Sequence, residues 1–207
     1  MHAIAPIDER RTLQQQRQWK RTPFREIAGM HWIIVGYGPI GRETAKRARA
    51  FGARITVVRR SSARDENVDR VATLDELPAV LPQADVIVLA CPLNDETRAL
   101  ADARFFAHTR ADAVLINIAR GGLIEEHALL HALDCGRLGR AVLDVFEPEP
   151  LPESSALWAH PNILVTAHTS FDGDGTRARW DELFFDNLPR FLRDEPLVNE
   201  VNQADLL

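Results

Sequence analysis

The stretch IIVGYGPIGRETAKRARAFGARITVVRRSS, residues 33–62, contains the residues that decide the fold. Its first apolar run ends in the pattern G-x-G-x-x-G, formed by Gly36, Gly38 and Gly41. In such a loop the first glycine permits a tight turn and the second lets the backbone approach a pyrophosphate. The third lets the following helix pack closely on the strand. Glycines also occur in strand–helix turns for packing alone. Because this motif joins an expected strand to the N-terminus of an expected helix, it predicts dinucleotide binding.

Short apolar runs alternate with helical segments from His31 onward. The runs WIIVG, ITVV, DVIVLA, AVLINI, RAVLDVF and ILVTA predict strands. The segments RETAKRARAF, LDELPAVL, ADARFFAH and EEHALLHALDCG between them predict helices. Short, fully apolar strands separated by helices are typical of a parallel sheet that is covered on both faces. The sequence therefore predicts an α/β fold with a Rossmann-like, doubly wound parallel sheet and helices on both faces.

Two further helices are expected outside this pattern. The segment IDERRTLQQQRQWKR, between Pro6 and Pro23, is polar and predicts a helix on the surface or at a subunit contact. The tail TRARWDELFFDNLPRFLRDEPLVNEV predicts a helix whose apolar face must pack on something. The residues at helical spacing on that face are Trp180, Leu183, Phe184, Leu188 and Phe191.

The overall composition excludes several functional classes. The 207 residues carry a formal net charge of −5 with charges of both signs interspersed, so nothing supports a nucleic-acid or membrane-surface role. Cys91 and Cys135 stand far apart without metal-ligand spacing, so we expect no metal site and a reducing compartment. The opening MHAIAPIDERR lacks an apolar signal core and no apolar run approaches transmembrane length, so we expect a cytoplasmic protein.

The residues after the second expected strand bear on the choice of cofactor. RITVV is followed by Arg59, Arg60 and Ser61, where an NAD site commonly has a carboxylate for the ribose 2′-OH. A carboxylate would repel a 2′-phosphate, whereas guanidinium groups form charge-assisted hydrogen bonds with it. The arginines are also compatible with ordinary surface charge at a strand end. We expect NADP(H) to be preferred, with NAD(H) as the alternative cofactor.

Three further residues lie at or just past the ends of expected strands, where ligands bind in an open α/β sheet. They are Arg120 in INIARGG, Glu149 in LDVFEPEPLP and His168 in VTAHTS. A histidine can donate the proton that ketone reduction by hydride transfer requires, a carboxylate can hold the histidine, and an arginine can grip a substrate carboxylate. Taken singly, these are also explained as a salt-bridging loop arginine, a solvated acid and a satisfied buried histidine. Their joint placement favours catalysis.

These motifs together resemble those of the D-isomer specific 2-hydroxyacid dehydrogenase family. The resemblance rests on VGYGPIGRETAKRARAFG, ADVIVLACPLNDET, LINIARGGLIEEHALLHAL and GRAVLDVFEPEPLPESSALWAHPNILVTAH, and it covers nearly the whole chain. It implies that Arg120 binds the carboxylate and carbonyl of the substrate, that His168 is the acid–base group and that Glu149 supports His168.

The cofactor site that the resemblance implies extends along several strand ends. Asp144 is expected to contact the nicotinamide carboxamide, and Pro92 and Thr97 to line the cleft. The RRSS strand end is similar to that of glyoxylate/hydroxypyruvate reductases that prefer NADPH. The complete expected set of cofactor-binding residues is Gly36, Gly38, Pro39, Ile40, Gly41, Arg59, Arg60, Ser61, Cys91, Pro92, Thr97, Ile118, Ala119, Arg120, Asp144 and His168.

Two departures from the family pattern are expected to matter. Ala167 stands where the family usually has a proline before the catalytic histidine. The family also inserts its dinucleotide domain into a substrate domain, and we expect that the first half of that substrate domain is missing here. The expected regions are an N-terminal crossover or dimer-contact helix (1–25), a dinucleotide-binding Rossmann domain (26–170) and a C-terminal return segment of the substrate domain (171–207).

The function that the resemblance implies is an NAD(P)H-dependent oxidoreductase. It would interconvert small 2-keto acids of the glyoxylate or hydroxypyruvate type and D-2-hydroxy acids, as a homodimer. We expect the missing half to weaken or abolish the activity of this chain alone. The alternative is a non-catalytic, oligomerising regulatory module that binds NAD(P).

Overall fold

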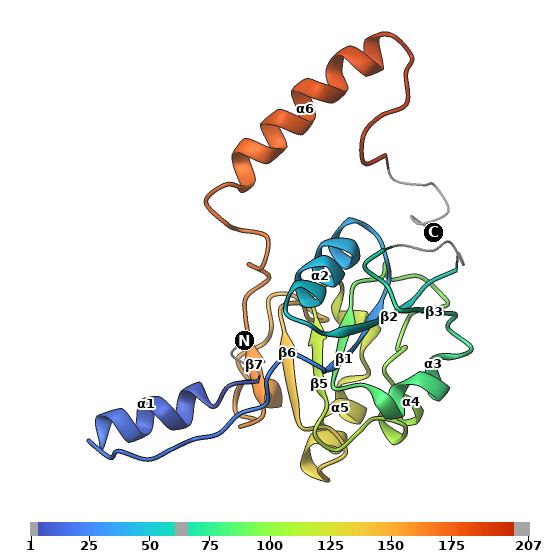
Figure 1. Ribbon diagram of the computed structural model, residues 1–207. Coiled ribbons are helices and arrows are strands. Elements are labelled where there is room, and N and C mark those ends of the chain that lie inside the picture. Colours follow the sequence, from blue (N-terminus) through green and yellow to red (C-terminus); the bar gives the residue numbers. More distant parts are fainter. Residues whose placement is uncertain (1–3, 61–65, 201–207) are drawn as a thin grey trace.

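The computed structural model describes residues 4–60 and 66–200 of the 207-residue chain. Within these residues one parallel sheet has the strand order β3-β2-β1-β4-β5-β6-β7 (Figure 1). This order places β1 and β4 side by side at the topological switch point and confirms the Rossmann-like, doubly wound sheet. The strands are β1 (His31–Val35), β2 (Arg54–Val58), β3 (Arg70–Ala72), β4 (Val86–Leu89), β5 (Val114–Asn117), β6 (Arg140–Leu143) and β7 (Ile163–Val165).

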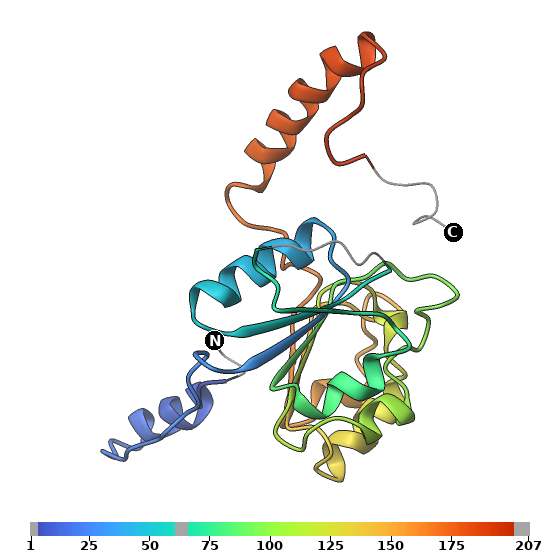
Figure 2. The same ribbon diagram turned by 45° about the vertical axis from the view of Figure 1, so that its right-hand side comes forward.

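Helices cover both faces of the sheet, as expected. One long helix, α2, packs on one face, and three shorter helices, α3 to α5, pack on the other (Figures 1 and 2). The α-helices are α1 (Ile7–Gln15), α2 (Pro39–Ala50), α3 (Leu77–Val80), α4 (Ala103–Ala107), α5 (Glu126–Asp134) and α6 (Thr176–Leu192). The described residues also form three short 3₁₀ helices, η1 (Leu81–Gln83), η2 (Gly121–Leu123) and η3 (Ala156–Trp158).

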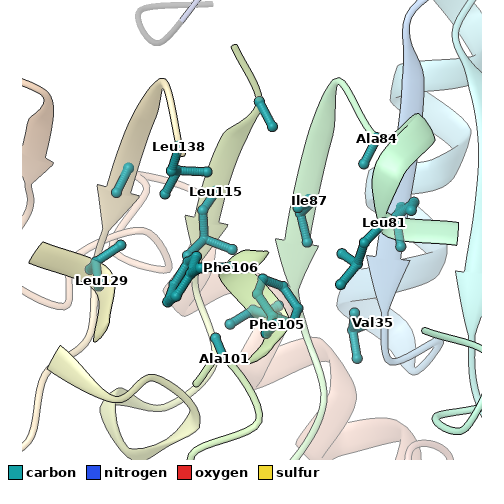
Figure 3. Close-up of a cluster of buried hydrophobic side chains, with 14 of the residues drawn as sticks. Val35, Leu81, Ala84, Ile87, Ala101, Phe105, Phe106, Leu115, Leu129 and Leu138 are labelled. Carbon is teal, nitrogen blue, oxygen red and sulfur yellow. The ribbon is translucent and has the colours of Figure 1, made fainter. Parts of the chain in front are cut away.

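Successive residues of the central strands point into two different cores, because side chains alternate across a strand. Val35 of β1 faces the cluster beneath α3, α4 and α5, whereas Ile34 faces the cluster beneath α2. In the larger cluster, Phe105 and Phe106 of α4 meet edge to face, with ring centroids 5.3 Å apart (Figure 3). Burial of each large apolar side chain contributes about 1.5–3 kcal/mol. These cores fix the strand ends that carry the site.

All six expected strands form, and β3 is an additional edge strand of three residues, RVA. The expected end of the first helix near Pro23 is wrong, because α1 ends at Gln15. Arg17 adopts a left-handed conformation with φ of 54°, and the N–H of Gln18 donates to the carbonyl of Leu13. This backbone closure satisfies the last carbonyls and stops the helix.

The last helix, α6, also ends earlier than expected, at Leu192 rather than within PLVNEV. Asp194 has a left-handed φ of 55°, and the N–H of Glu195 donates to the carbonyl of Arg190 at 2.9 Å. Pro196 follows and cannot continue a helix, because it has no backbone N–H.

The apolar face of α6 is uncovered. Trp180, Phe184 and Phe191 have exposed fractions of 59%, 61% and 71%. Figure 2 shows α6 standing away from the sheet, beyond the segment that follows β7. We expect this face either to associate with a second copy or to leave the tail displaced and mobile. Both alternatives stay predictions, as does the division of the chain into three regions. No helix in the described part of the chain is long and apolar enough to cross a membrane.

Candidate active site

The ends of six strands lie side by side at one edge of the sheet. Strand pairing aligns their last residues in one row, Val58, Val35, Leu89, Asn117, Leu143 and Val165. In an open α/β sheet the crevice beyond these carboxyl ends is where ligands bind. Each predicted site residue that the structure describes follows one of these strands, in the next loop or the next helical turn. The topology therefore brings the predicted residues to one edge.

The glycine loop after β1 has the shape that a dinucleotide requires. Gly36 has a φ of 96°, and a Cβ at this position would lie 2.5 Å from the carbonyl oxygen of Ala90. A Cβ at Gly41 would collide with the carbonyl oxygen of Gly36, so the loop and α2 pack backbone to backbone. A Cβ at Gly38 would meet nothing within 4 Å. The loop is therefore closed on the strand side and open at Gly38, where α2 begins, and it fits a pyrophosphate at the helix N-terminus.

Arginines gather beside the glycine loop. Arg59 follows β2 and is half-buried, whereas Arg60 is exposed. The guanidinium carbon of Arg59 lies 5.1 Å from the ring centroid of Tyr37, and that of Arg42 in α2 lies at the same distance. Sequence reasoning missed Tyr37 and Arg42, although an aromatic residue inside the glycine motif and an arginine directly after it could have indicated them. The predicted contribution of Ser61 lies outside the described residues.

His168 and Glu149 form a hydrogen-bonded pair. His168 Nδ1 and Glu149 Oε2 are 2.8 Å apart, and the N–H of Phe146 donates to the other carboxylate oxygen at 2.9 Å. The hydrogen bonds from His168 and Phe146, together with the charge of Arg120, hold the pKa of Glu149 below its ordinary value. The carboxylate is therefore ionised at neutral pH. With Nδ1 engaged by Glu149, Nε2 is the ring nitrogen that can exchange a proton with a substrate.

The loop that carries His168 is held by Asp144, which is 2% exposed. Its Oδ1 accepts from Thr166 Oγ1 at 2.5 Å and from the N–H of Thr169 at 3.1 Å, and its Oδ2 accepts from the N–H of Ser170 at 3.1 Å. Burial opposes the ionisation of Asp144, but these hydrogen bonds outweigh burial and lower its pKa. Asp144 thus anchors the histidine loop, and its contact with the nicotinamide carboxamide stays a prediction.

Two aromatic rings support His168 from the side of α6. His168 has a φ of 52°, a left-handed conformation that histidine adopts more readily than most side chains. The ring of Phe171 meets His168 edge-on, with centroids 6.0 Å apart, and Trp180 stacks on Phe171 at 6.3 Å. Sequence reasoning placed Trp180 on the apolar face of the tail helix and did not single out Phe171. The contacts connect α6 with the histidine.

Arg120 lies in the loop between β5 and η2 and is exposed. Asn117 Nδ2 donates to the carbonyl of Arg120 at 2.9 Å, and Arg120 Nη1 donates to the preceding carbonyl at 2.6 Å. A Cβ at Gly121 would collide with the carbonyl carbon of Phe146, so glycine lets this loop touch the segment that leads to Glu149. The arrangement brings together a cation, a carboxylate and an imidazole, the three groups needed to grip and protonate a 2-keto acid.

The other predicted cofactor residues lie at the same edge in different settings. Thr97 is buried, and its hydroxyl donates to the carbonyl of Pro92 at 2.7 Å and accepts from the N–H of Asn94 at 2.9 Å. It therefore braces the loop after β4. Burial raises the pKa of the Cys91 thiol to about 11, so the thiol is neutral at neutral pH. Two pairs of residues complete the set. Pro39 and Ile40 are exposed at the start of α2, and Ile118 and Ala119 are partly buried after β5.

Metal ligation finds no support in residues 4–60 and 66–200. No group of three or more His, Cys, Asp or Glu side chains in these ranges could hold a metal ion.

Comparisons with known proteins agree with this geometry. The chain is 34% identical over 162 residues to a glyoxylate/hydroxypyruvate reductase A of Serratia proteamaculans (strain 568). This alignment covers 78% of this chain and 52% of the relative. A D-isomer specific 2-hydroxyacid dehydrogenase family protein of Aeromonas salmonicida subsp. salmonicida A449 is similar in structure, with a TM-score of 0.87 and 38% identity, covering 95% of this chain and 63% of that one. An NADPH-dependent glyoxylate/hydroxypyruvate reductase of Sinorhizobium meliloti, solved with NADP and sulfate, has a TM-score of 0.84 and 30% identity, with the same two coverages of 95% and 63%.

The matched region of the chain corresponds to one domain of the longer relatives. The chain spans about half the length of the curated relatives it matches. Residues 1–170 match the description "D-isomer specific 2-hydroxyacid dehydrogenase, NAD binding domain", and this region contains the glycine loop and the Arg120, Glu149 and His168 positions. The chain therefore belongs to the D-isomer specific 2-hydroxyacid dehydrogenase family.

Proposed function

We propose that the chain binds NADP(H) along the carboxyl edge of the sheet and takes part in interconverting small 2-keto acids and D-2-hydroxy acids by hydride transfer. The observation that carries the proposal is the 2.8 Å hydrogen bond between His168 and Glu149, with Arg120 close enough to influence the carboxylate. A module that only binds a dinucleotide has no need of this acid–base pair, so the regulatory alternative is not favoured. Glyoxylate and hydroxypyruvate are the proposed substrates, because relatives named as reductases of these acids match the chain.

Each residue of the proposed site has one role. When bound, the dihydronicotinamide supplies the hydride. Arg120 pairs with the substrate carboxylate through its planar guanidinium and polarises the adjacent carbonyl. His168 donates the proton on Nε2 to the carbonyl oxygen while the carbonyl carbon accepts the hydride, which yields the alcohol. Glu149 accepts from Nδ1–H and stabilises the protonated ring before that transfer. In the reverse direction the neutral His168 accepts the hydroxyl proton.

The proposal is tested by measuring binding and turnover separately. NADPH binding is titrated by calorimetry, and NADPH oxidation is followed with glyoxylate and with hydroxypyruvate. Both are measured in the 207-residue chain and in the longest chain that its gene encodes. We expect binding in both, and turnover in a chain that carries a complete substrate domain. Binding without turnover of any small 2-keto acid in such a chain would overturn the catalytic proposal and support a regulatory module.

Replacement of Glu149 by Gln is expected to shift the pH profile of reduction. The N–H of Phe146 would keep the amide oxygen in place, so the Gln NH₂ would face His168 Nδ1 and no longer favour a protonated ring. The Glu149 carboxylate is charged at neutral pH because its pKa is lowered, so Glu149→Gln removes a negative charge that favours the protonated donor. The high-pH limb of kcat for reduction should therefore move to lower pH in Glu149→Gln.

The matched control for this shift is Glu147→Gln. Glu147 lies two residues from Glu149, and its carboxylate pairs with Arg98 at 3.2 Å instead of with the histidine. Its profile should coincide with that of the wild type. An unshifted profile in Glu149→Gln, with His168→Ala inactive, would show that Glu149 does not act through His168.

Cofactor preference is expected to depend on Arg59 and Arg60. NADPH should bind more tightly than NADH, and the double variant Arg59→Ala/Arg60→Ala should lose most of the preference. A charge-assisted hydrogen bond contributes about 1.5–3 kcal/mol, or roughly 10- to 100-fold in affinity. Arg54→Ala, at the opposite end of β2, is the control and should keep the preference. Equal affinity of the wild type for NADPH and NADH at matched ionic strength would contradict the proposal.

A further inference from the structure

Tyr37 links three elements that meet at the mouth of the glycine loop. It lies between Gly36 and Gly38 and is 7% exposed. The guanidinium carbons of Arg42 and Arg59 each lie 5.1 Å from the centroid of its ring. Arg42 belongs to the first turns of α2, and Arg59 directly follows β2. One buried ring therefore contacts a cation from the helix and a cation from the neighbouring strand end.

The ring offsets the cost of placing two like charges close together. The two guanidinium groups lie at most twice the ring distance apart, and at that separation two cations repel each other. An aromatic face carries negative charge density and attracts both cations, and its planar surface suits a flat guanidinium. Two positive side chains are thus held next to the end of β2.

A dianion is the ligand that such a pair favours. Each guanidinium can donate two parallel hydrogen bonds to phosphate oxygens, and two of them approaching from different elements can bind different oxygens of one group. The position matters as well. The end of the second strand of a dinucleotide fold is where the adenosine ribose is recognised. A phosphate on that ribose is the group that distinguishes NADP from NAD.

We propose that Tyr37 is a positioning residue that holds Arg42 and Arg59 as a two-guanidinium clamp for the 2′-phosphate of an NADP-type cofactor. Arg42 is then a phosphate-binding residue, and the preference for NADP(H) depends on an aromatic side chain inside the glycine motif. This inference rests on the proposed binding of NADP(H). It differs from that proposal because it assigns the preference to Tyr37 and Arg42 as well as to the arginines after β2.

The test uses 2′,5′-ADP and 5′-AMP, which differ by the 2′-phosphate and need no turnover. Their affinities for the 207-residue chain are measured by calorimetry at fixed ionic strength. The wild type should bind 2′,5′-ADP more tightly than 5′-AMP. Arg42→Gln should weaken 2′,5′-ADP binding by about tenfold and leave 5′-AMP binding unchanged, because one charge-assisted contact is lost. Tyr37→Leu should do the same, since leucine fills space without offering a π face.

Two further variants separate positioning from packing. Tyr37→Phe keeps the ring and should keep the full preference for 2′,5′-ADP. The double variant Tyr37→Leu/Arg42→Gln should lose less than the product of the two single effects, because both changes break one arrangement. Lys46→Gln, on an exposed position of the same helix, is the charge-matched control for Arg42→Gln. Thermal unfolding verifies folding, and if Tyr37→Leu does not fold, Arg42→Gln and Tyr37→Phe decide.

The outcomes distinguish this inference from the proposed function. A wild type that binds 2′,5′-ADP and 5′-AMP equally would overturn the proposed NADP(H) preference and the clamp together. A wild type that prefers 2′,5′-ADP, loses the preference in Arg59→Ala and keeps it in both Arg42→Gln and Tyr37→Leu would overturn the clamp alone. A loss of preference in Tyr37→Phe equal to that in Tyr37→Leu would show that the hydroxyl, rather than the ring face, is responsible.

Discussion

His168→Ala, made in a chain that carries a complete substrate domain, is expected to lower kcat for 2-keto acid reduction by about 10²–10⁴-fold, the usual contribution of a general acid. The substitution removes Nε2, the proton donor of the chemical step, together with the ring that Glu149 holds at 2.8 Å. NADPH affinity should change far less than kcat, because the glycine loop and the arginines after β2 are untouched. The loss should therefore fall on kcat rather than on cofactor binding. Steady-state kinetics and a parallel NADPH titration measure the two effects separately.

A second variant at this position guards against a misfolded loop. His168 has a φ of 52°, and asparagine tolerates this left-handed conformation well. His168→Asn should fold, keep its NADPH affinity and be as impaired in kcat as His168→Ala. His127→Ala removes an exposed histidine of α5 and should be fully active. If His168→Asn retained more than a small fraction of wild-type kcat, another group would have to supply the proton.

The strand ends and the glycine loop could be predicted from the sequence for a physical reason. Buried parallel strands must be apolar throughout, so runs such as DVIVLA can be recognised in a single sequence. The G-x-G-x-x-G motif can be recognised in the same way, because its glycines are required for steric reasons. A Cβ at Gly36 would lie 2.5 Å from the Ala90 carbonyl oxygen, so the residue type follows from the backbone packing. Because parallel strands share one direction, residues after their ends reach one edge. That is why the sequence alone is enough to group Arg120, Glu149 and His168.

Contacts between loops could not be predicted in the same way. The hydrogen bonds that Asp144 accepts from Thr166, Thr169 and Ser170 connect two loops whose relative path depends on the whole sheet. Tyr37 and Arg42 stand inside and directly after the glycine motif, but their positions in the sequence do not show that the ring and the guanidinium are in contact. The ends of α1 and α6 also differ from the expected ones, because helix propensity continues past the residues where left-handed backbone closes each helix.

Arg120→Lys is expected to lower kcat/KM for the 2-keto acid by roughly 100-fold, through a higher KM and a lower kcat together. Lysine keeps the positive charge but loses the planar fork that can bind a carboxylate and an adjacent carbonyl at once, and each charge-assisted hydrogen bond lost costs about 1.5–3 kcal/mol. The loop itself should survive, because Asn117 holds the backbone carbonyl at 2.9 Å and the side chain is exposed.

Chemical rescue distinguishes the loss of the Arg120 guanidinium from a structural defect in the loop. Added guanidinium should restore part of the activity of Arg120→Ala, because it supplies the missing planar donor, whereas an alkylammonium salt at the same concentration should not. Arg98→Lys, which alters the exposed arginine paired with Glu147, is the matched control and should leave both constants unchanged. A rise in KM with unaltered kcat in Arg120→Lys would show that the arginine binds substrate and transition state equally, and the polarisation of the carbonyl would then need another donor.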